Sequence, residues 1–269
     1  MATAPPTRIH LLPAKEAPYV VIIRRNPSKT FHIIRWNIEH DEFEHGSWFT
    51  GHIYTHRSDV SFDGKWMVYL ARGAGGATWN GVCLLPYLKT YLEADAPDAW
   101  GGGGYWKDSN TLLTSYWQST TGSAPFRLEP MTGDGTQNSE ALHLRMARDG
   151  WKRNGNYWGA DRRIRGKKYL KARDGDDGWN WQFERRGPTL EAFFRGYLEH
   201  VANYEFRMRE FPALLNKEVE WATFAANGDL VFARLGCVYR YSRKDLRRGK
   251  PGFAADLNGL TREMTGSGK

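Results

Sequence analysis

Residues 58–71 read SDVSFDGKWMVYLA, and this stretch decides the fold. Short strand-like segments flank the pair Asp63-Gly64. An Asp-Gly pair supplies the positive-φ positions that a two-residue hairpin loop requires. The stretch therefore predicts a β-hairpin.

Related strand-turn-strand patterns recur around Asp108, Asp149 and Asn227. The spacing is 45 positions from Asp63 to Asp108, 41 from Asp108 to Asp149, and 78, or two steps of 39, from Asp149 to Asn227. A repeat of about 40 residues holds four short strands and their turns, which is the content of one β-propeller blade.

We therefore predict an all-β fold, a small β-propeller of five or six blades, with residues 1–269 forming a single domain. Residues 1–18 are expected to be a poorly ordered or edge-strand N-terminal segment, and residues 260–269 a flexible tail. Strand-like segments near the two ends, including residues 229–241, are expected to pair and close the ring.

One segment departs from the strand pattern. After Pro188-Thr189, apolar residues fall at positions 190, 193, 194, 197, 198 and 201. This spacing is typical of an amphipathic helix, and Pro188 with Thr189 is a suitable helix start. We predict a helical insertion near residues 189–202.

Residues 62–69, FDGKWMVY, resemble the blade motif of TolB-type and WD-repeat-like β-propellers, in which an aromatic residue precedes an Asp-Gly turn and an apolar strand follows. Residues 224–232, FAANGDLVF, are similar, whereas the copies near Asp108 and Asp149 match less well. The chain also resembles small uncharacterised bacterial propeller-like proteins. The resemblance implies a fold and no particular activity, because propellers serve enzymes, transport factors and scaffolds alike.

The composition is that of a globular protein, with 269 residues of which 41% are apolar and 25% charged. No apolar run approaches the roughly 20 residues of a membrane helix, and residues 1–12 lack the features of a secretory signal. A cytoplasmic location is therefore expected. Cys83 and Cys237 lie in apolar strand-like segments and are interpreted as small buried side chains rather than a disulfide or zinc site.

The chain is basic, with 38 lysines and arginines against 30 acids and a net charge of +8. Much of the excess lies in residues 162–171 and 240–250. Such runs suit a phosphate backbone, so binding of nucleic acid or another polyanion is one alternative function, while solubility also explains the charge. In the first run the candidate contacts are Arg162, Arg163, Arg165, Lys167 and Lys168.

The sequence contains no hydrolase nucleophile elbow, phosphate-binding loop or zinc-protease motif. Asp59 and Glu220 fall on expected inner strands, where two carboxylates facing a channel would suit a propeller hydrolase, a glycosidase or lactonase. Alternatively, each acid is hydrogen-bonded to the backbone or to a neighbouring arginine. We predict no catalytic residue, metal ligand or cofactor, and the hydrolase stays an alternative.

The chain holds 12 tryptophans, most of which are expected between blades. Trp79, Trp100 and Trp179 are expected at exposed loop tips, and tryptophan is enriched among the residues that dominate binding energy. The favoured function is non-catalytic recognition or a scaffold role. The partner would be a macromolecule, foremost a protein, bound through one loop face that carries these tryptophans.

Overall fold

The computed structural model describes residues 5–27, 29–96, 102–115, 120–131, 140–154, 180–184, 188–198, 201–216 and 218–266. Its strands fall into five groups in chain order. The first group contains β1 (Arg8–Pro13), β2 (Tyr19–Arg25), β3 (Thr30–Asn37) and β4 (Glu42–Ile53). The second contains β5 (Asp59–Val60), β6 (Trp66–Gly73), β7 (Thr78–Leu84) and β8 (Thr90–Asp95). The third contains β9 (Gly104–Asp108), β10 (Thr111–Thr114) and β11 (Arg127–Pro130).

The fourth group contains β12 (Lys152–Asn154), β13 (Asn180–Glu184), β14 (Thr189–Leu198) and β15 (Val201–Met208). The fifth contains β16 (Val219–Phe224), β17 (Leu230–Arg234), β18 (Cys237–Tyr241) and β19 (Phe253–Asp256). Short helices interrupt the strands at η1 (Thr55–Arg57), α1 (Glu140–Arg148) and α3 (Arg243–Arg248). None of the helices in the described part combines the length and apolar character that crossing a membrane requires.

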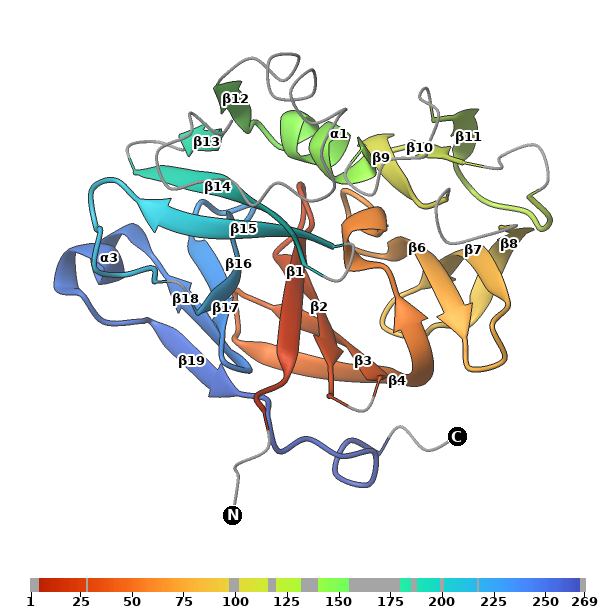
Figure 1. Cartoon of the computed structure of the whole chain (residues 1–269), viewed down its shortest axis with the longest axis horizontal. Helices are drawn as coiled ribbons and strands as arrows, with labels where there is room; N and C mark the ends of the chain where they lie inside the picture. Colours follow the sequence, from red (N-terminus) through yellow and green to blue (C-terminus); the bar gives the residue numbers. More distant parts are fainter. Residues whose placement is uncertain are drawn as a thin grey trace.

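Neighbouring strands within each group pair antiparallel among the described residues, except that β11 runs parallel to β10. The first two groups form one sheet because β4 also pairs with β6, with Gly51 opposite Gly73. The groups lie around β1, with the second to its right and the fifth to its left in Figure 1. The prediction of a mainly β fold is confirmed and the arrangement is propeller-like, while the number of blades, five or six, stays a prediction.

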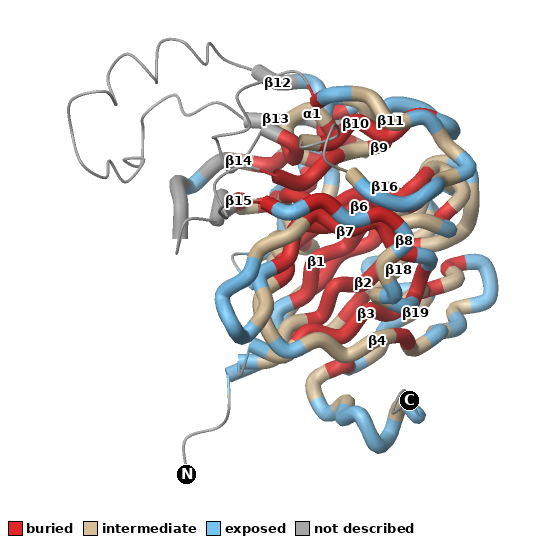
Figure 2. The backbone as a smooth tube through the Cα atoms, turned by 90° about the vertical axis from the view of Figure 1, so that its right-hand side faces the viewer, coloured by how far each residue is buried: buried red, intermediate tan, exposed pale blue. Residues whose placement is uncertain are grey.

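The first group of strands is buried on both faces, because other parts of the chain pack on each. Along β2, Val20 and Ile22 lie in a core cluster shared with α1 and the fifth group, whereas Val21 and Ile23 lie in one shared with β6 and β7. Consecutive strand residues point to opposite faces, so a sheet covered on both sides needs an uninterrupted apolar run. A third cluster, around Trp106, joins the second and third groups. Figure 2 shows the resulting buried interior running through β1, β2 and β6.

The predicted hairpin in residues 58–71 forms between β5 and β6, but its loop is longer than two residues. The Ser61 N–H donates to the Trp66 carbonyl at 2.8 Å, so residues 62–65 form the loop, and Gly64 adopts a φ of 73°. The Ser61 hydroxyl donates to Asp63 Oδ1 at 2.6 Å and accepts from the Trp66 N–H at 2.9 Å. These side-chain hydrogen bonds stabilise the four-residue loop.

The predicted hairpin around Asp149 is wrong, because this position follows the helix α1. Gly150, with a φ of 96°, lies just beyond the end of the helix, and Leu142 and Met146, one turn apart, are both buried. Residues 142–148 read LHLRMAR, and their near-regular apolar–polar alternation imitates the period of a strand.

The predicted helix near residues 189–202 is also wrong, because β14 and β15 form an antiparallel hairpin there. Ala192 and Phe206, both buried, lie opposite each other in it. A register shift between Phe194 and Tyr197 interrupts the two-residue alternation of β14. The apolar residues on the two sides of this irregularity therefore imitate helical spacing.

The two ends of the described chain meet without pairing as strands, contrary to the prediction. The first group comes wholly from residues 8–53 and the fifth from residues 219–256, and β1 packs against β16 and β17. The Ile9 N–H donates to the Glu220 carboxylate, and the Thr7 N–H donates to Asn258 Oδ1 at 2.9 Å. Side-chain hydrogen bonds and packing therefore join the two ends in place of the predicted strand pairing.

The predicted terminal segments are partly described. Within residues 1–18, β1 is the end strand of its sheet and most of its side chains are buried. Within residues 260–269, the described part lies against β4, where the Trp48 indole N–H donates to Thr265 Oγ1 at 2.9 Å.

Arg24 in β2 fastens the segment after β19 to the first sheet. Its side chain is fully buried, and its Nε donates to the Leu257 carbonyl at 2.6 Å. Its Nη2 donates to the carbonyls of Asn258 at 2.8 Å and Leu260 at 3.2 Å. Burial lowers the pKa of Arg24 to about 10, against an opposing effect of Asp256, so the guanidinium stays charged at neutral pH.

Replacing Arg24 by methionine should lower the free energy of unfolding by about 3 kcal/mol, because three carbonyls lose a charged donor. Urea denaturation measures this change. The matched control is Arg25→Met at the half-buried neighbouring arginine, which should cost less than about 1 kcal/mol. Equal, small effects of both substitutions would show that Arg24 does not hold the C-terminal segment.

Candidate functional site

Asp59, the acid of β5, lies in a buried polar cluster with Arg148 and the backbone of Trp106. Its side chain is 1% exposed. Its Oδ2 accepts a hydrogen bond from the Trp106 N–H of β9 at 2.8 Å and forms an ion pair with the Arg148 guanidinium, whose Nη2 also donates to Oδ1 at 3.3 Å. The alternative in which the inner-strand acid binds the backbone and an arginine is therefore the arrangement observed for Asp59.

The last turn of α1 supplies two arginines to this cluster, Arg145, which is buried, and Arg148, whose side chain is 9% exposed. Arg145 and Arg148 are three residues apart and therefore lie on one side of the helix. Arg145 donates to the Ser58 carbonyl and, through Nη2, to His10 Nε2 at 3.1 Å. Arg148 donates to the Trp106 carbonyl at 2.6 Å. The helix is thereby bonded to β1, β9 and the residues around β5.

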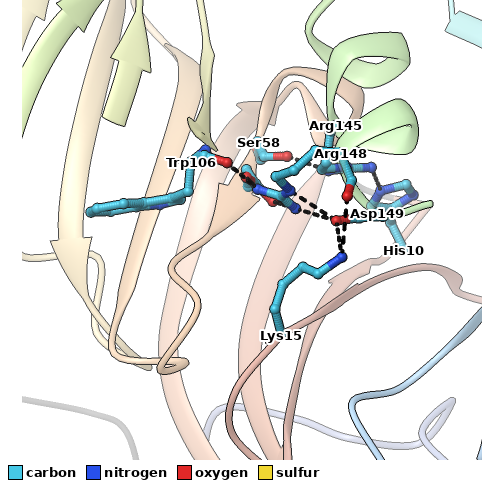
Figure 3. Close-up of polar contacts among 8 residues, drawn as sticks. His10, Lys15, Ser58, Trp106, Arg145, Arg148 and Asp149 are labelled. Carbon is cyan, nitrogen blue, oxygen red and sulfur yellow. Dashed lines mark hydrogen bonds and ion pairs between the residues drawn. The ribbon is translucent and has the colours of Figure 1, made fainter. Parts of the chain in front are cut away.

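Asp149, directly after α1, is the second acid of the cluster. Its Oδ1 accepts from Arg148 Nε at 2.8 Å and from Lys15 Nζ at 3.1 Å (Figure 3). Three cations, Lys15, Arg145 and Arg148, thus surround the two carboxylates. Both oxygens of Asp59 thus accept hydrogen bonds from the protein itself, whereas the hydrogen bonds of Asp149 are both to its Oδ1.

The two arginines have opposite pKa shifts. Burial lowers the pKa of Arg148, but Asp59 and Asp149 together raise it further, so it lies above the ordinary value. Burial lowers the pKa of Arg145, and the attraction of Asp59 compensates only in part. Arg145 also lies over the Trp221 ring, with its guanidinium carbon 5.8 Å from the ring centroid. This contact adds a cation–π attraction at a buried site.

Two imidazoles lie beside Arg145. Burial and the charge of Arg145 lower the pKa of His10 well below its usual value and that of His56 to about 3. The His10 ring lies 4.3 Å from that of Trp221, centroid to centroid. Because arginine can only donate, His10 Nε2 accepts the Arg145 hydrogen bond, so the imidazole is neutral at this nitrogen.

Glu220 on β16 is the other acid that the sequence places on an inner strand. It accepts a hydrogen bond from the Ile9 N–H. Burial raises its pKa to about 7, against the opposing effects of that N–H and of Arg8. Asp59 and Glu220 share no hydrogen-bond partner within the described residues. No group of three or more His, Cys, Asp and Glu side chains there could hold a metal ion.

The structure describes one of the eight predicted partner-binding residues, Trp79. It lies in β7, half-buried, with its ring edge-to-face to Phe49 at 5.9 Å and packed against the core between the first two groups. The expected loop-tip position is therefore wrong for Trp79, because β7 begins at Thr78 and carries it into the sheet. The other seven residues lie outside the described ones: Trp100, Trp179, Arg162, Arg163, Arg165, Lys167 and Lys168.

Sequence reasoning missed three exposed apolar residues around the β7–β8 turn, Leu84, Tyr87 and Tyr91, which are 41%, 52% and 50% exposed. We call these three residues the β7–β8 surface. The Tyr91 ring packs edge-to-face on Trp66, with centroids 5.0 Å apart, and Trp66 packs in the same way on Phe126 at 5.5 Å. The sequence signal was the pair of tyrosines in residues 84–91, LLPYLKTY.

The turn that carries this surface is fixed to β4. The Ser47 N–H donates to the Pro86 carbonyl at 3.2 Å, and the Ser47 hydroxyl accepts from the Leu88 N–H at 3.0 Å. At Gly46, a Cβ atom would lie 2.0 Å from the Pro86 carbonyl oxygen, so only glycine permits this close approach. The exposed tyrosines are therefore presented on an anchored turn.

Comparison with known proteins gives remote likenesses. No protein-family model matches the sequence, and no curated protein matches it. The fold is similar to that of the uncharacterised protein lmo1340 from Listeria monocytogenes EGD-e, with 10% identity over 93% of this chain and 94% of that one and a TM-score of 0.40. It is also similar to the WD40 domain of SCAP from fission yeast, with 7% identity over 95% of this chain and 66% of that one and a TM-score of 0.25. Because both scores are low, the propeller-like description depends on the strand pairing of this chain.

Replacing Asp59 by asparagine should lower the free energy of unfolding by about 3 kcal/mol, because Arg148 loses one of its two carboxylates. Urea denaturation measures the loss. The exposed Asp95 provides the matched control, and Asp95→Asn should cost less than about 0.5 kcal/mol. Full stability of Asp59→Asn would contradict the structural role of this acid.

Replacing Glu220 by glutamine should change stability in a pH-dependent way. The folded pKa of Glu220, about 7, lies above its ordinary value of 4.5, so its contribution to stability is present at low pH and is lost as pH rises through 7. Relative to the wild type, Glu220→Gln should gain on the order of 2 kcal/mol between about pH 5 and about pH 8.5. Denaturation at the two pH values measures this gain, and a difference that is independent of pH would refute the raised pKa.

Proposed function

We propose that this chain is a non-catalytic recognition protein that binds a partner protein through the β7–β8 surface. The observation that carries the proposal is the exposure of Leu84, Tyr87 and Tyr91 on an anchored turn. Aromatic residues are enriched in the buried cores of protein interfaces, and a fixed surface loses little conformational entropy on binding.

The positions of these residues favour a specific surface over scattered exposure. In the described part of the chain, the large apolar side chains that are exposed are those three together with Leu235 and Met264. Three of the five therefore fall within eight consecutive positions. Trp66 and Phe126 extend the surface inward as half-buried aromatic neighbours, which suits an interface with an apolar centre.

The hydrolase alternative receives less support from the acids of the interior. Asp59 and Asp149 are bound by cations of the chain itself, and Glu220 accepts a backbone N–H, so each acid already has a structural partner. The polyanion alternative is favoured by a separate feature, the basic helix α3. A cytoplasmic location remains part of the proposal.

The proposal is tested by cross-linking the tagged full-length protein in cells of its own source. We expect one or more proteins to cross-link to the wild type and to be lost with Tyr87→Ser combined with Tyr91→Ser, because the apolar centre of the contact is removed. The control is Met264→Ser, which removes the most exposed large apolar side chain at a different place, 71% exposed. It should retain the partner.

Two results would contradict this proposal. One is an identical set of cross-linked proteins with the wild type and the double variant. The other is the absence of any protein that cross-links to the wild type more strongly than to an unrelated tagged control. Thermal melting of the double variant shows whether it stays folded, and only a small loss is expected at these exposed positions.

A further inference from the structure

The helix α3 and the residue two positions after it carry an unusual concentration of exposed positive charge. Residues 243–250 read RKDLRRGK, and their five cations against one carboxylate give +4, half of the net charge of +8 of the whole chain. All five cations are exposed. We call them the α3 basic surface, which consists of Arg243, Lys244, Arg247, Arg248 and Lys250.

The one carboxylate in this segment is occupied by the helix cap. Asp245 Oδ2 accepts from the Ser242 N–H at 3.0 Å, and the Ser242 hydroxyl accepts in turn from the Asp245 N–H at 3.2 Å. This is a capping box, and Gly249 ends the helix in the left-handed conformation with a φ of 68°. Leu246 is buried beneath the helix. The segment is therefore pinned at both ends and at its centre.

No ion pair with an aspartate or glutamate is found for any of the five cations within the described part of the chain. Other surface arginines are neutralised there: Arg209 pairs with Glu191 at 2.9 Å, and Arg240, three residues before α3, pairs with both Asp41 and Asp229. The α3 basic surface thus gathers five exposed cations without a carboxylate partner within eight consecutive positions.

Helix stability explains only part of this charge. Arg247 and Arg248 lie in the last turn, where cations interact favourably with the helix dipole. Arg243 and Lys244 lie in the first turn, where the same dipole disfavours them. Arg243 and Arg247 are also four positions apart, a spacing at which like charges repel. A fixed segment that keeps unfavourable charges is typical of a binding surface.

We propose that the α3 basic surface binds the phosphate backbone of nucleic acid without sequence preference. Three of its five cations are arginines, whose planar guanidinium binds phosphate through two parallel hydrogen bonds. An anionic membrane is the less suitable partner, because an interfacial helix inserts exposed apolar side chains and the apolar residue of α3, Leu246, is buried in the protein. This surface shares no residue with the β7–β8 surface, so the two proposals succeed or fail separately.

The test is the binding of a fluorescein-labelled single-stranded DNA of about 20 nucleotides by the full-length protein, followed by fluorescence anisotropy over a range of salt concentrations. With three to five phosphate contacts, the logarithm of the binding constant should fall with the logarithm of salt with a slope of about −2 to −4. Arg243→Glu combined with Arg247→Glu should weaken binding at least about tenfold and make the slope shallower by about 1.5.

The control variant carries Lys65→Glu and Lys89→Glu, two exposed lysines in turns beside β6 and β8, and has the same net charge as the α3 variant. It should weaken binding less than about twofold at the same salt concentration. Glutamate at position 243 suits the helix N-terminus, so the α3 variant should stay folded, which circular dichroism verifies.

Three outcomes would overturn the proposal. The first is no measurable binding by the wild type at low salt, and the second is equal weakening in both variants, which would indicate net charge alone. The third is binding of the wild type to vesicles of phosphatidylserine and phosphatidylcholine as tightly as to DNA, with the same loss in the α3 variant, which would favour a membrane surface.

Discussion

The ion pair between Arg148 and Asp59 is the interaction on which the middle of the molecule depends. It brings the end of α1 against β5, and the same arginine binds the backbone of β9 through the Trp106 carbonyl. A buried carboxylate without a cation, or a buried guanidinium without a carboxylate, would cost several kcal/mol. The two side chains therefore require each other, and α1 and β5, which carry them, are held together.

This ion pair limits the chemistry that the polar cluster around Asp59 can perform. An acid that acts in hydrolysis must exchange a proton or attack a substrate, and so needs a free oxygen. Both oxygens of Asp59 bind Arg148, and His10 accepts a hydrogen bond from Arg145. The polar groups of this cluster bind one another, whereas the β7–β8 surface and the α3 basic surface consist of exposed side chains outside it. The proposals of a protein contact at the β7–β8 turn and a nucleic-acid contact at α3 both follow from this division.

The mainly β fold could be predicted from the sequence because its signals are local. The Asp-Gly turn after β5 and the apolar run of β2 each report the structure of a few neighbouring residues. The errors arose where two periods coincide: the alternation in residues 142–148 conceals α1, and the irregularity in β14 imitates a helix. In both segments tertiary packing selects the structure, and that information is not local.

The candidate site was predictable only in part. The sequence placed Asp59 on an inner strand and included an arginine among its possible partners, but Arg148 is 89 positions away and no spacing rule connects them. Trp79 was expected at an exposed loop tip, yet it lies within the strand β7. Exposure of Tyr87 and Tyr91 depends on what packs over β8, which only the structure shows.

The central claim is that solvent does not reach the polar cluster around Asp59. Its most direct test is native-state hydrogen exchange of the backbone amides, resolved to single residues by NMR. The Trp106 N–H, which donates to Asp59, should exchange only through global unfolding, with the same opening free energy as the amide of Ile22 in the core strand β2. Exchange of Trp106 through small local openings, while Ile22 stays protected, would contradict the account. Solvent would then reach Asp59 in the folded protein and leave this acid available for chemistry.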